Sequence, residues 1–130
     1  MIGHLEPDEM WKAYKGYKYT ININSVKQSP TMFARRVYES LASGTPVVSN
    51  YSKGVVEQFG DIVCASDDPD EIVSFLEKMQ DESEYRKVVE KGVREVLSKH
   101  TVADRLKQIC NRIGIDVTDH LPNAYLITNV

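Results

Sequence analysis

The stretch from Ser29 to Val48 decides the fold, and it runs Ser-Pro-Thr-Met-Phe-Ala-Arg-Arg-Val-Tyr-Glu-Ser-Leu-Ala-Ser-Gly-Thr-Pro-Val-Val. Between Phe33 and Ala42 the apolar residues recur at the three- and four-residue spacing of one helical face. Gly44 suits the left-handed position that follows a helix, and the proline two residues later blocks any continuation. The stretch therefore predicts a helix of about three turns, followed by a buried strand from Val47.

The expected start of this helix carries residues that suit a phosphate-bearing ligand. Ser29 or Thr31 can cap the helix, whose free N–H groups and dipole favour anions. Arg35 and Arg36 would add positive charge beside that end. Glu39 would lie roughly 9 Å farther along the axis, where its carboxylate can accept hydrogen bonds from ribose hydroxyls. The alternative is an amphipathic core helix on which Arg35 and Glu39 form an ordinary ion pair.

The run from Arg36 to Val48 resembles the donor-site signature of GT-B glycosyltransferases of the group 1 type. In particular it is similar to the spore-maturation (spore-coat) glycosyltransferase-like branch, in which an arginine precedes an aromatic-Glu pair. In that superfamily two glutamates, eight positions apart, flank the start of the helix. The second glutamate contacts the ribose of the nucleotide sugar and matches Glu39. The first is replaced here by Thr31, a departure that this branch commonly shows.

The resemblance implies a Rossmann-like parallel sheet with flanking helices, as in the second half of a GT-B donor domain. It covers roughly residues 1–113, and residues 114–130 would form a tail or open a following domain. It also implies a hexosyltransferase that moves a sugar from a nucleotide diphosphate sugar, such as a UDP- or GDP-sugar, to an acceptor. No metal or other cofactor is expected, because the helix dipole and arginines would neutralise the leaving diphosphate.

Particular residues receive roles from the same resemblance. Arg35 and Arg36 would contact the diphosphate, and Glu39 the ribose. The backbone amides of residues 31–33, which are Thr31, Met32 and Phe33, would form the anion cradle after Ser29.

A second loop of the expected site lies at residues 52–57, which resemble the Gly…Glu turn of the family. Gly54 would let this loop approach the diphosphate and sugar through its backbone N–H groups. A plain strand-to-helix connection is an equally good interpretation. The segment Gly3-His4-Leu5 would end a strand whose loop lies near the nucleobase.

The rest of the chain alternates helix and strand patterns, which predicts a parallel α/β sheet with helices on both faces. The expected strands are Tyr19–Asn24, Asp61–Cys64 and residues 124–128, and a first helix runs from Glu6 to Gly16. A second helix is capped by Asp68, with Glu71 completing a capping box, and a third begins at Asp81 or Ser83, with Gly92 at a close contact. The last helix is capped by Thr101, and its inward-facing residues are Val102, Leu106, Ile109 and Ile113.

Composition narrows the function class further. The 130 residues carry a net charge of −3, so a nucleic-acid partner is not expected. No apolar run approaches the roughly 20 residues of a membrane helix. Cys64 and Cys110 lack metal-ligand spacing and are expected to be reduced, which favours a cytoplasmic protein.

The resemblance also predicts parts that the chain does not contain. Donor domains of this family have about two more strand–helix units ahead of residue 1, preceded by an acceptor-binding domain. The chain alone is therefore not expected to catalyse transfer. The competing hypothesis is a non-enzymatic interaction module of the flavodoxin or receiver type. A receiver would need acidic residues at the strand ends, where this chain has Asn24 and Asn50.

Overall fold

The computed structural model describes residues 5–117. Its contacts divide the chain into two units, residues 1–100 and residues 101–130. The first unit contains a parallel sheet in the order β1-β2-β3, formed by Thr20–Asn22, Val47–Ser49 and Cys64–Ala65. Ile21 pairs with Val48, which pairs in turn with Cys64. The prediction of a Rossmann-like parallel α/β fold is confirmed, whereas the predicted boundary after residue 113 stays a prediction.

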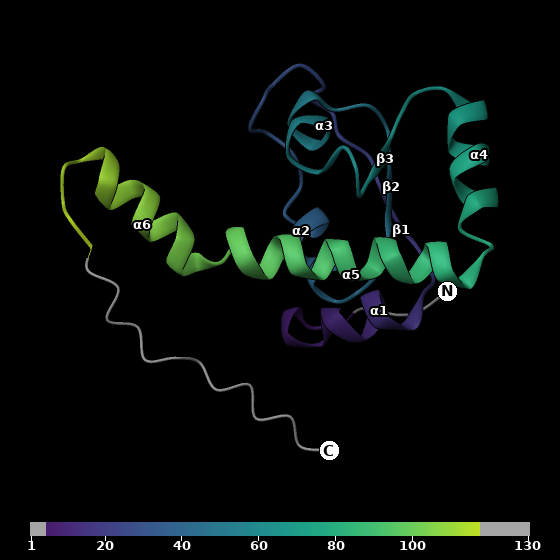
Figure 1. Ribbon diagram of the computed structural model, residues 1–130, viewed down its shortest axis with the longest axis horizontal. Coiled ribbons are helices and arrows are strands. Elements are labelled where there is room, and N and C mark those ends of the chain that lie inside the picture. The colour runs from purple at the N-terminus through teal and green to yellow at the C-terminus, as the bar shows by residue number, and fades with distance from the viewer. Residues whose placement is uncertain (1–4, 118–130) are drawn as a thin grey trace. The chain divides into compact units, whose positions relative to one another are not determined.

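Helices connect and flank these strands (Figure 1). The first unit has a short 3₁₀ helix, Pro7–Glu9, and the helices α1 (Met10–Gly16), α2 (Arg36–Ala42), α3 (Lys53–Phe59), α4 (Pro69–Lys78) and α5 (Glu82–Lys99). The second unit contributes α6 (Val102–Arg112). No helix in the described part of the chain is long and apolar enough to cross a membrane.

The core lies where α2 packs against the sheet and against α5. Val37 and Leu41 of α2 are buried together with Val47 of β2. A Cβ atom at Gly92 of α5 would lie 3.0 Å from Leu41 Cδ2, so the predicted close contact at this glycine is confirmed. Gly44 ends α2 with a φ of 79°, the left-handed conformation expected from the sequence.

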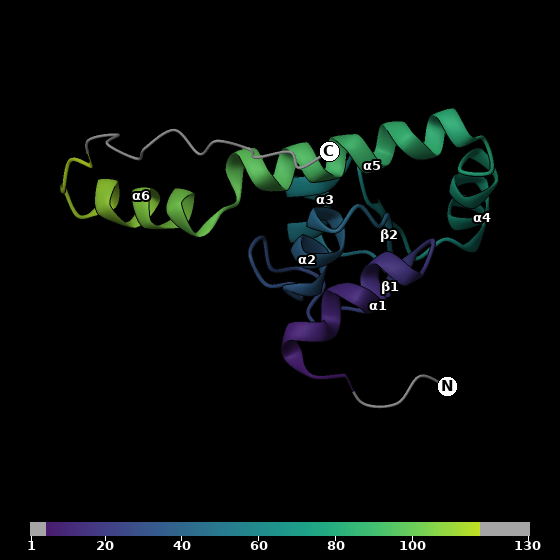
Figure 2. The same ribbon diagram turned by 90° about the horizontal axis from the view of Figure 1, so that it is seen from below.

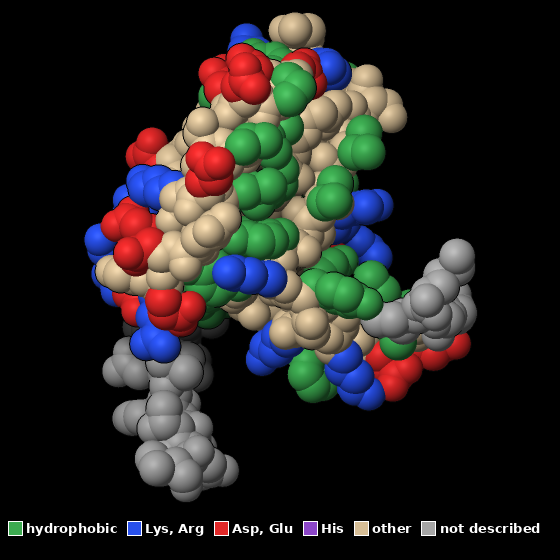
Figure 3. Space-filling model, turned by 90° about the vertical axis from the view of Figure 1, so that its right-hand side faces the viewer, with side chains coloured by type: hydrophobic (Ala, Val, Ile, Leu, Met, Phe, Trp, Pro, Cys, Tyr) green, Lys and Arg blue, Asp and Glu red, His purple; other side chains and the backbone are tan. Residues whose placement is uncertain are grey.

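One face of β1 is open, and it is the apolar face. Ile21 and Ile23 are 72% and 77% exposed, whereas Asn22 and Asn24 are 0% and 6% exposed. Helices α2 and α3 lie on one side of the sheet and α4 on the other, in both ribbon views (Figures 1 and 2). Seen from the α4 side, hydrophobic side chains gather in a long band (Figure 3). The alternation of apolar and polar residues thus predicts the two faces of β1 correctly, but the buried face carries the polar side chains.

Helix α2 is shorter than predicted because a turn holds the chain before it. The Ser29 hydroxyl accepts hydrogen bonds from the N–H groups of Thr31 and Met32, at 3.3 and 3.1 Å. The helix itself begins at Arg36 and has no side-chain cap. The prediction of a helix that starts near Phe33 and is capped by Ser29 or Thr31 is therefore wrong.

The third strand and the start of α4 also differ from the predictions. Residues 61–63 form the turn after α3, so β3 starts only at Cys64. Asp68 caps α4 as predicted, and it accepts a hydrogen bond from the Asp70 N–H group at 2.9 Å. Glu71 completes no capping box here, because its carboxylate accepts a hydrogen bond from the Ser66 hydroxyl.

The N-terminal caps of α5 and α6 are among those predicted from the sequence. Asp81 accepts hydrogen bonds from two N–H groups at the start of α5, and Thr101 forms a capping box with Asp104 at the start of α6. The apolar face of α6, formed by Val102, Leu106, Ile109 and Ile113, is more than half exposed, although it was predicted to face inward. In the second unit the structure describes this helix and a few residues after it, which offer no core. The strand predicted at residues 124–128, and Gly3 and His4, lie outside the described residues.

Candidate functional site

A cleft with a volume of about 1080 Å³ opens beside α2. Arg35, Arg36 and Glu39 line it from the start of α2, and Trp11 and Tyr14 line it from α1. Helix α1 packs against α2, so these side chains are held by two neighbouring elements. Three of the residues proposed from the sequence therefore share one cleft with two aromatic side chains.

Glu39 lies at the cleft and not in the core. Its side chain is 41% exposed, and its Oε1 atom lies 3.2 Å from Arg35 Nε. Its Oε2 atom accepts a hydrogen bond of 2.9 Å from the Tyr14 hydroxyl. The ion pair with Arg35 is the one that the alternative interpretation expected. Glu39 nevertheless remains accessible to a ligand in the cleft.

Tyr14 is the cleft residue whose role the sequence did not suggest, because its partner Glu39 is 25 positions away. Burial raises the pKa of Tyr14 above its ordinary value, and the hydrogen bond and negative charge of Glu39 raise this pKa further. The charges of Arg36 and Arg35 act in the opposite direction. The Tyr14 carbonyl accepts a hydrogen bond of 2.6 Å from the Thr45 hydroxyl, which ties α1 to the turn after α2.

The residues of the predicted anion cradle lie in a different hollow. Thr31, Met32 and Phe33 line a depression of about 450 Å³, together with Asn24. Ala34 lines both this hollow and the larger cleft, so the two are neighbours along the chain. The structure thus distributes six of the predicted site residues over two adjacent depressions, and Ser29 and Gly54 line neither of them.

Gly54 and Ser29 contact each other through their backbones. The Gly54 N–H group donates to the Ser29 carbonyl at 3.1 Å, and the Lys53 N–H group donates to the Lys27 carbonyl at 2.7 Å. A Cβ atom at Gly54 would lie 2.9 Å from the Pro30 carbonyl oxygen. Gly54 therefore permits close approach of the chain's own loop, in keeping with a plain strand-to-helix connection.

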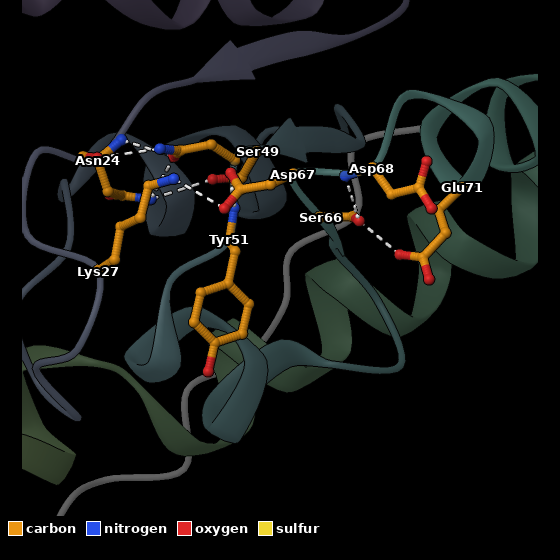
Figure 4. Close-up of polar contacts among 9 residues, drawn as sticks. Asn24, Lys27, Ser49, Tyr51, Ser66, Asp67, Asp68 and Glu71 are labelled. Atoms are coloured by element: carbon orange, nitrogen blue, oxygen red, sulfur yellow. Dashed lines mark hydrogen bonds and ion pairs between the residues drawn. The ribbon is translucent and has the colours of Figure 1, made fainter.

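A buried network of amide and hydroxyl side chains follows the carboxyl ends of β1 and β2 (Figure 4). Asn22 Nδ2 donates to Asn24 Oδ1 and to Ser49 Oγ, both at 3.1 Å. Asn24 Nδ2 also donates to Ser49 Oγ at 3.1 Å. Asn50 Oδ1 accepts a hydrogen bond of 2.8 Å from the Asn24 N–H group, and Asn50 Nδ2 donates one of 3.0 Å to the Asn24 carbonyl. This network fixes the start of the loop that leads to α2.

An ion pair joins the same loop to the chain after β3. Lys27 Nζ lies 2.7 Å from Asp67 Oδ2, and the Tyr51 N–H group donates to Asp67 Oδ1 at 3.2 Å (Figure 4). The hydrogen bond from Lys27 lowers the pKa of Asp67. Loops that follow all three strands are therefore linked at this edge of the sheet, where ligands bind in open parallel sheets.

Residues 5–117 hold no group of three or more His, Cys, Asp and Glu side chains that could bind a metal ion. Both Cys64 and Cys110 are free thiols.

The parallel sheet with flanking helices defines a Rossmann-like α/β fold, and beside α2 it carries a cleft lined by arginine, carboxylate and aromatic side chains. The family model described as "Glycosyl transferase-like" matches residues 1–111, and the chain belongs to that family. No curated protein and no solved structure matched the chain. Family membership indicates a glycosyltransferase role in general, with a sugar donor as substrate, and disfavours the interaction-module alternative.

Proposed function

We propose that this chain forms part of the donor site of a glycosyltransferase that uses a nucleotide diphosphate sugar, such as a UDP- or GDP-sugar. The observation that carries the proposal is the cleft in which Arg35, Arg36 and Glu39 lie side by side in a member of the glycosyl transferase-like family. Guanidinium groups bind phosphate oxygens well, and a carboxylate accepts hydrogen bonds from sugar hydroxyls. The three residues together suit a ribonucleoside diphosphate.

The proposed roles follow the positions of the side chains. Arg35 and Arg36 are exposed at the start of α2, where they can contact a diphosphate. Glu39 is one turn farther along the helix and would hold the ribose. The hollow lined by Thr31, Met32 and Phe33 adjoins the cleft and is the proposed place of the sugar end of the donor.

The GT-B fold, the spore-coat branch and the hexosyl type also belong to this proposal. The open face of β1 supports the idea that the chain is the second half of a donor domain. β1 is an edge strand, and Ile21 and Ile23 leave an apolar surface beside it. A preceding half-domain would pair with this edge and cover these side chains, and an acceptor-binding domain would complete the enzyme. The chain alone would then bind donor without transferring the sugar.

Two expectations from composition stay predictions within this proposal. One is a cytoplasmic location, which rests on the unpaired cysteines of the sequence. The other is the lack of a nucleic-acid partner, which rests on the net charge of −3.

Calorimetric titration of the protein with UDP and with GDP tests the proposal. Glu39→Ala should weaken binding of the preferred nucleotide by about 1–3 kcal/mol, because hydrogen bonds to a charged group are lost. Glu90→Ala, which removes an exposed carboxylate from α5, serves as the matched control. Equal affinities of the unchanged protein and Glu39→Ala would remove Glu39 from the site.

A further inference from the structure

The Glu39 carboxylate is held by a different donor on each of its oxygens. Arg35 Nε lies 3.2 Å from Oε1, and the Tyr14 hydroxyl donates to Oε2 at 2.9 Å. From this arrangement we infer that Tyr14 is a positioning residue of the donor site, which orients Glu39 toward a ribose diol. The inference rests on the proposed function and adds a residue that selects ribonucleotides over deoxyribonucleotides.

The number of acceptor positions explains how Tyr14 can help without blocking the site. An ionised carboxylate offers about four lone-pair positions, two on each oxygen. Arg35 and Tyr14 use one position on each oxygen, so one acceptor position remains on each. A ribose presents two neighbouring hydroxyl groups, one for each remaining position. The carboxylate of Glu39 can therefore accept both hydroxyls while it keeps its two protein partners.

Tyr14 is suited to orient Glu39 because it is itself fixed. The Thr45 hydroxyl donates to the Tyr14 carbonyl at 2.6 Å, and helix α1 packs against α2. The side chain of Tyr14 is partly buried and lines the same cleft as Glu39. Arg35, by contrast, has a side chain that is 87% exposed. Tyr14 is therefore the less exposed of the two donors to the Glu39 carboxylate.

The hydroxyl also stays a donor at neutral pH. Burial and the neighbouring Glu39 raise the pKa of Tyr14 above its ordinary value of 10.0. The proton therefore stays on the phenol over the whole physiological range. The phenol can therefore donate its hydrogen bond to Oε2 throughout this range.

The test compares ribonucleotides with their 2′-deoxy forms. UDP, 2′-deoxy-UDP, GDP and 2′-deoxy-GDP are titrated into the unchanged protein, Tyr14→Phe and Tyr17→Phe. Tyr17, an exposed tyrosine just after α1 that does not line the cleft, is the matched control. The unchanged protein should bind the preferred ribonucleotide about 5- to 20-fold more tightly than its 2′-deoxy form, which lacks one hydrogen bond to a carboxylate.

Tyr14→Phe should weaken binding of the ribonucleotide about 3- to 10-fold and leave the 2′-deoxy form much less affected. The preference for ribose thus shrinks, while Tyr17→Phe keeps it. In a Glu39→Gln background the Tyr14→Phe change should have little further effect, because Tyr14 acts through Glu39. If Tyr14→Phe folds poorly, Glu39→Gln tests the same hydrogen bond by changing its acceptor instead of its donor.

The outcomes separate this inference from the proposed function. A ribose preference that survives in Tyr14→Phe, or an equal loss for both forms, overturns the positioning role and leaves the donor site in place. An equal affinity of the unchanged protein for ribo- and deoxyribonucleotides removes the diol contact of Glu39 itself. Failure of the unchanged protein to bind UDP and GDP overturns the proposed function and this inference with it.

Discussion

Replacement of Asn24 by alanine should destabilise the protein, because it removes a buried side chain that links the ends of β1 and β2. The Asn24 side chain accepts a hydrogen bond of 3.1 Å from Asn22 and donates one of 3.1 Å to Ser49. It also accepts a longer bond of 3.4 Å from the Ala34 N–H group. Each neutral hydrogen bond contributes about 1 kcal/mol, so Asn24→Ala should lower the free energy of unfolding by about 2–3 kcal/mol.

Urea unfolding of the unchanged protein and of Asn24→Ala, followed by circular dichroism and extrapolated to water, measures this loss in the free energy of unfolding. Asn111→Ala, which changes an exposed asparagine of α6, is the control and should stay within about 0.5 kcal/mol of the unchanged protein. A loss below about 0.5 kcal/mol for Asn24→Ala would refute the reasoning. It would mean that the network adds little to the pairing of β1 with β2.

Three further predictions concern other parts of the chain. Gly44→Ala should lower the free energy of unfolding by about 1–2 kcal/mol, because the φ of 79° is costly for alanine; an unchanged urea midpoint would contradict this. In an NMR titration the carboxyl group of Asp67 should show a pKa below its ordinary value of 3.8, and Lys27→Met should move this pKa back up. The ion pair then stabilises the fold fully above pH 3.8, and this stabilisation is lost as the pH falls through the lowered pKa of Asp67. An unshifted pKa would exclude the ion pair in solution. Thr101→Ala should remove the cap that pairs with Asp104 and speed amide exchange in α6 about 5-fold, for a loss of about 1 kcal/mol; equal exchange would show that the cap is dispensable.

The elements of the fold were predictable from local sequence signals. Periodicity and caps located α5 and α6, and Gly44 and the valines after it located the end of α2 and the start of β2. These signals are local because a helix and its caps involve residues within about four positions. The start of α2 was not predictable in this way, since Ser29 uses its hydroxyl in a turn of its own.

Burial in β1 depended on partners that lie far away in the sequence. The alternation of isoleucine and asparagine identified two faces, and hydrophobicity alone would bury Ile21. Asn22 is buried instead, because Ser49, 27 positions later, supplies a hydrogen-bond partner in the interior. Such a pairing cannot be deduced from β1 by itself.

The candidate site shows the same division. Arg35, Arg36 and Glu39 were identified from the sequence and share a cleft, whereas the sequence suggested no role for their neighbour Tyr14. The structure separates the cleft from the hollow at residues 31–33 because the chain turns before α2 begins. Gly54, predicted from resemblance, has its N–H group in a hydrogen bond to Ser29.

An amide chemical-shift map of the labelled protein with UDP and with GDP tests the central claim most directly. If the cleft beside α2 is the donor site, the preferred nucleotide should shift the signals of residues 35–39 and of Tyr14, with saturation on titration. The backbone signals of α6 should stay in place. Shifts confined to residues far from this cleft, or no shift with either nucleotide, would contradict the assignment of Arg35, Arg36 and Glu39 to a sugar donor.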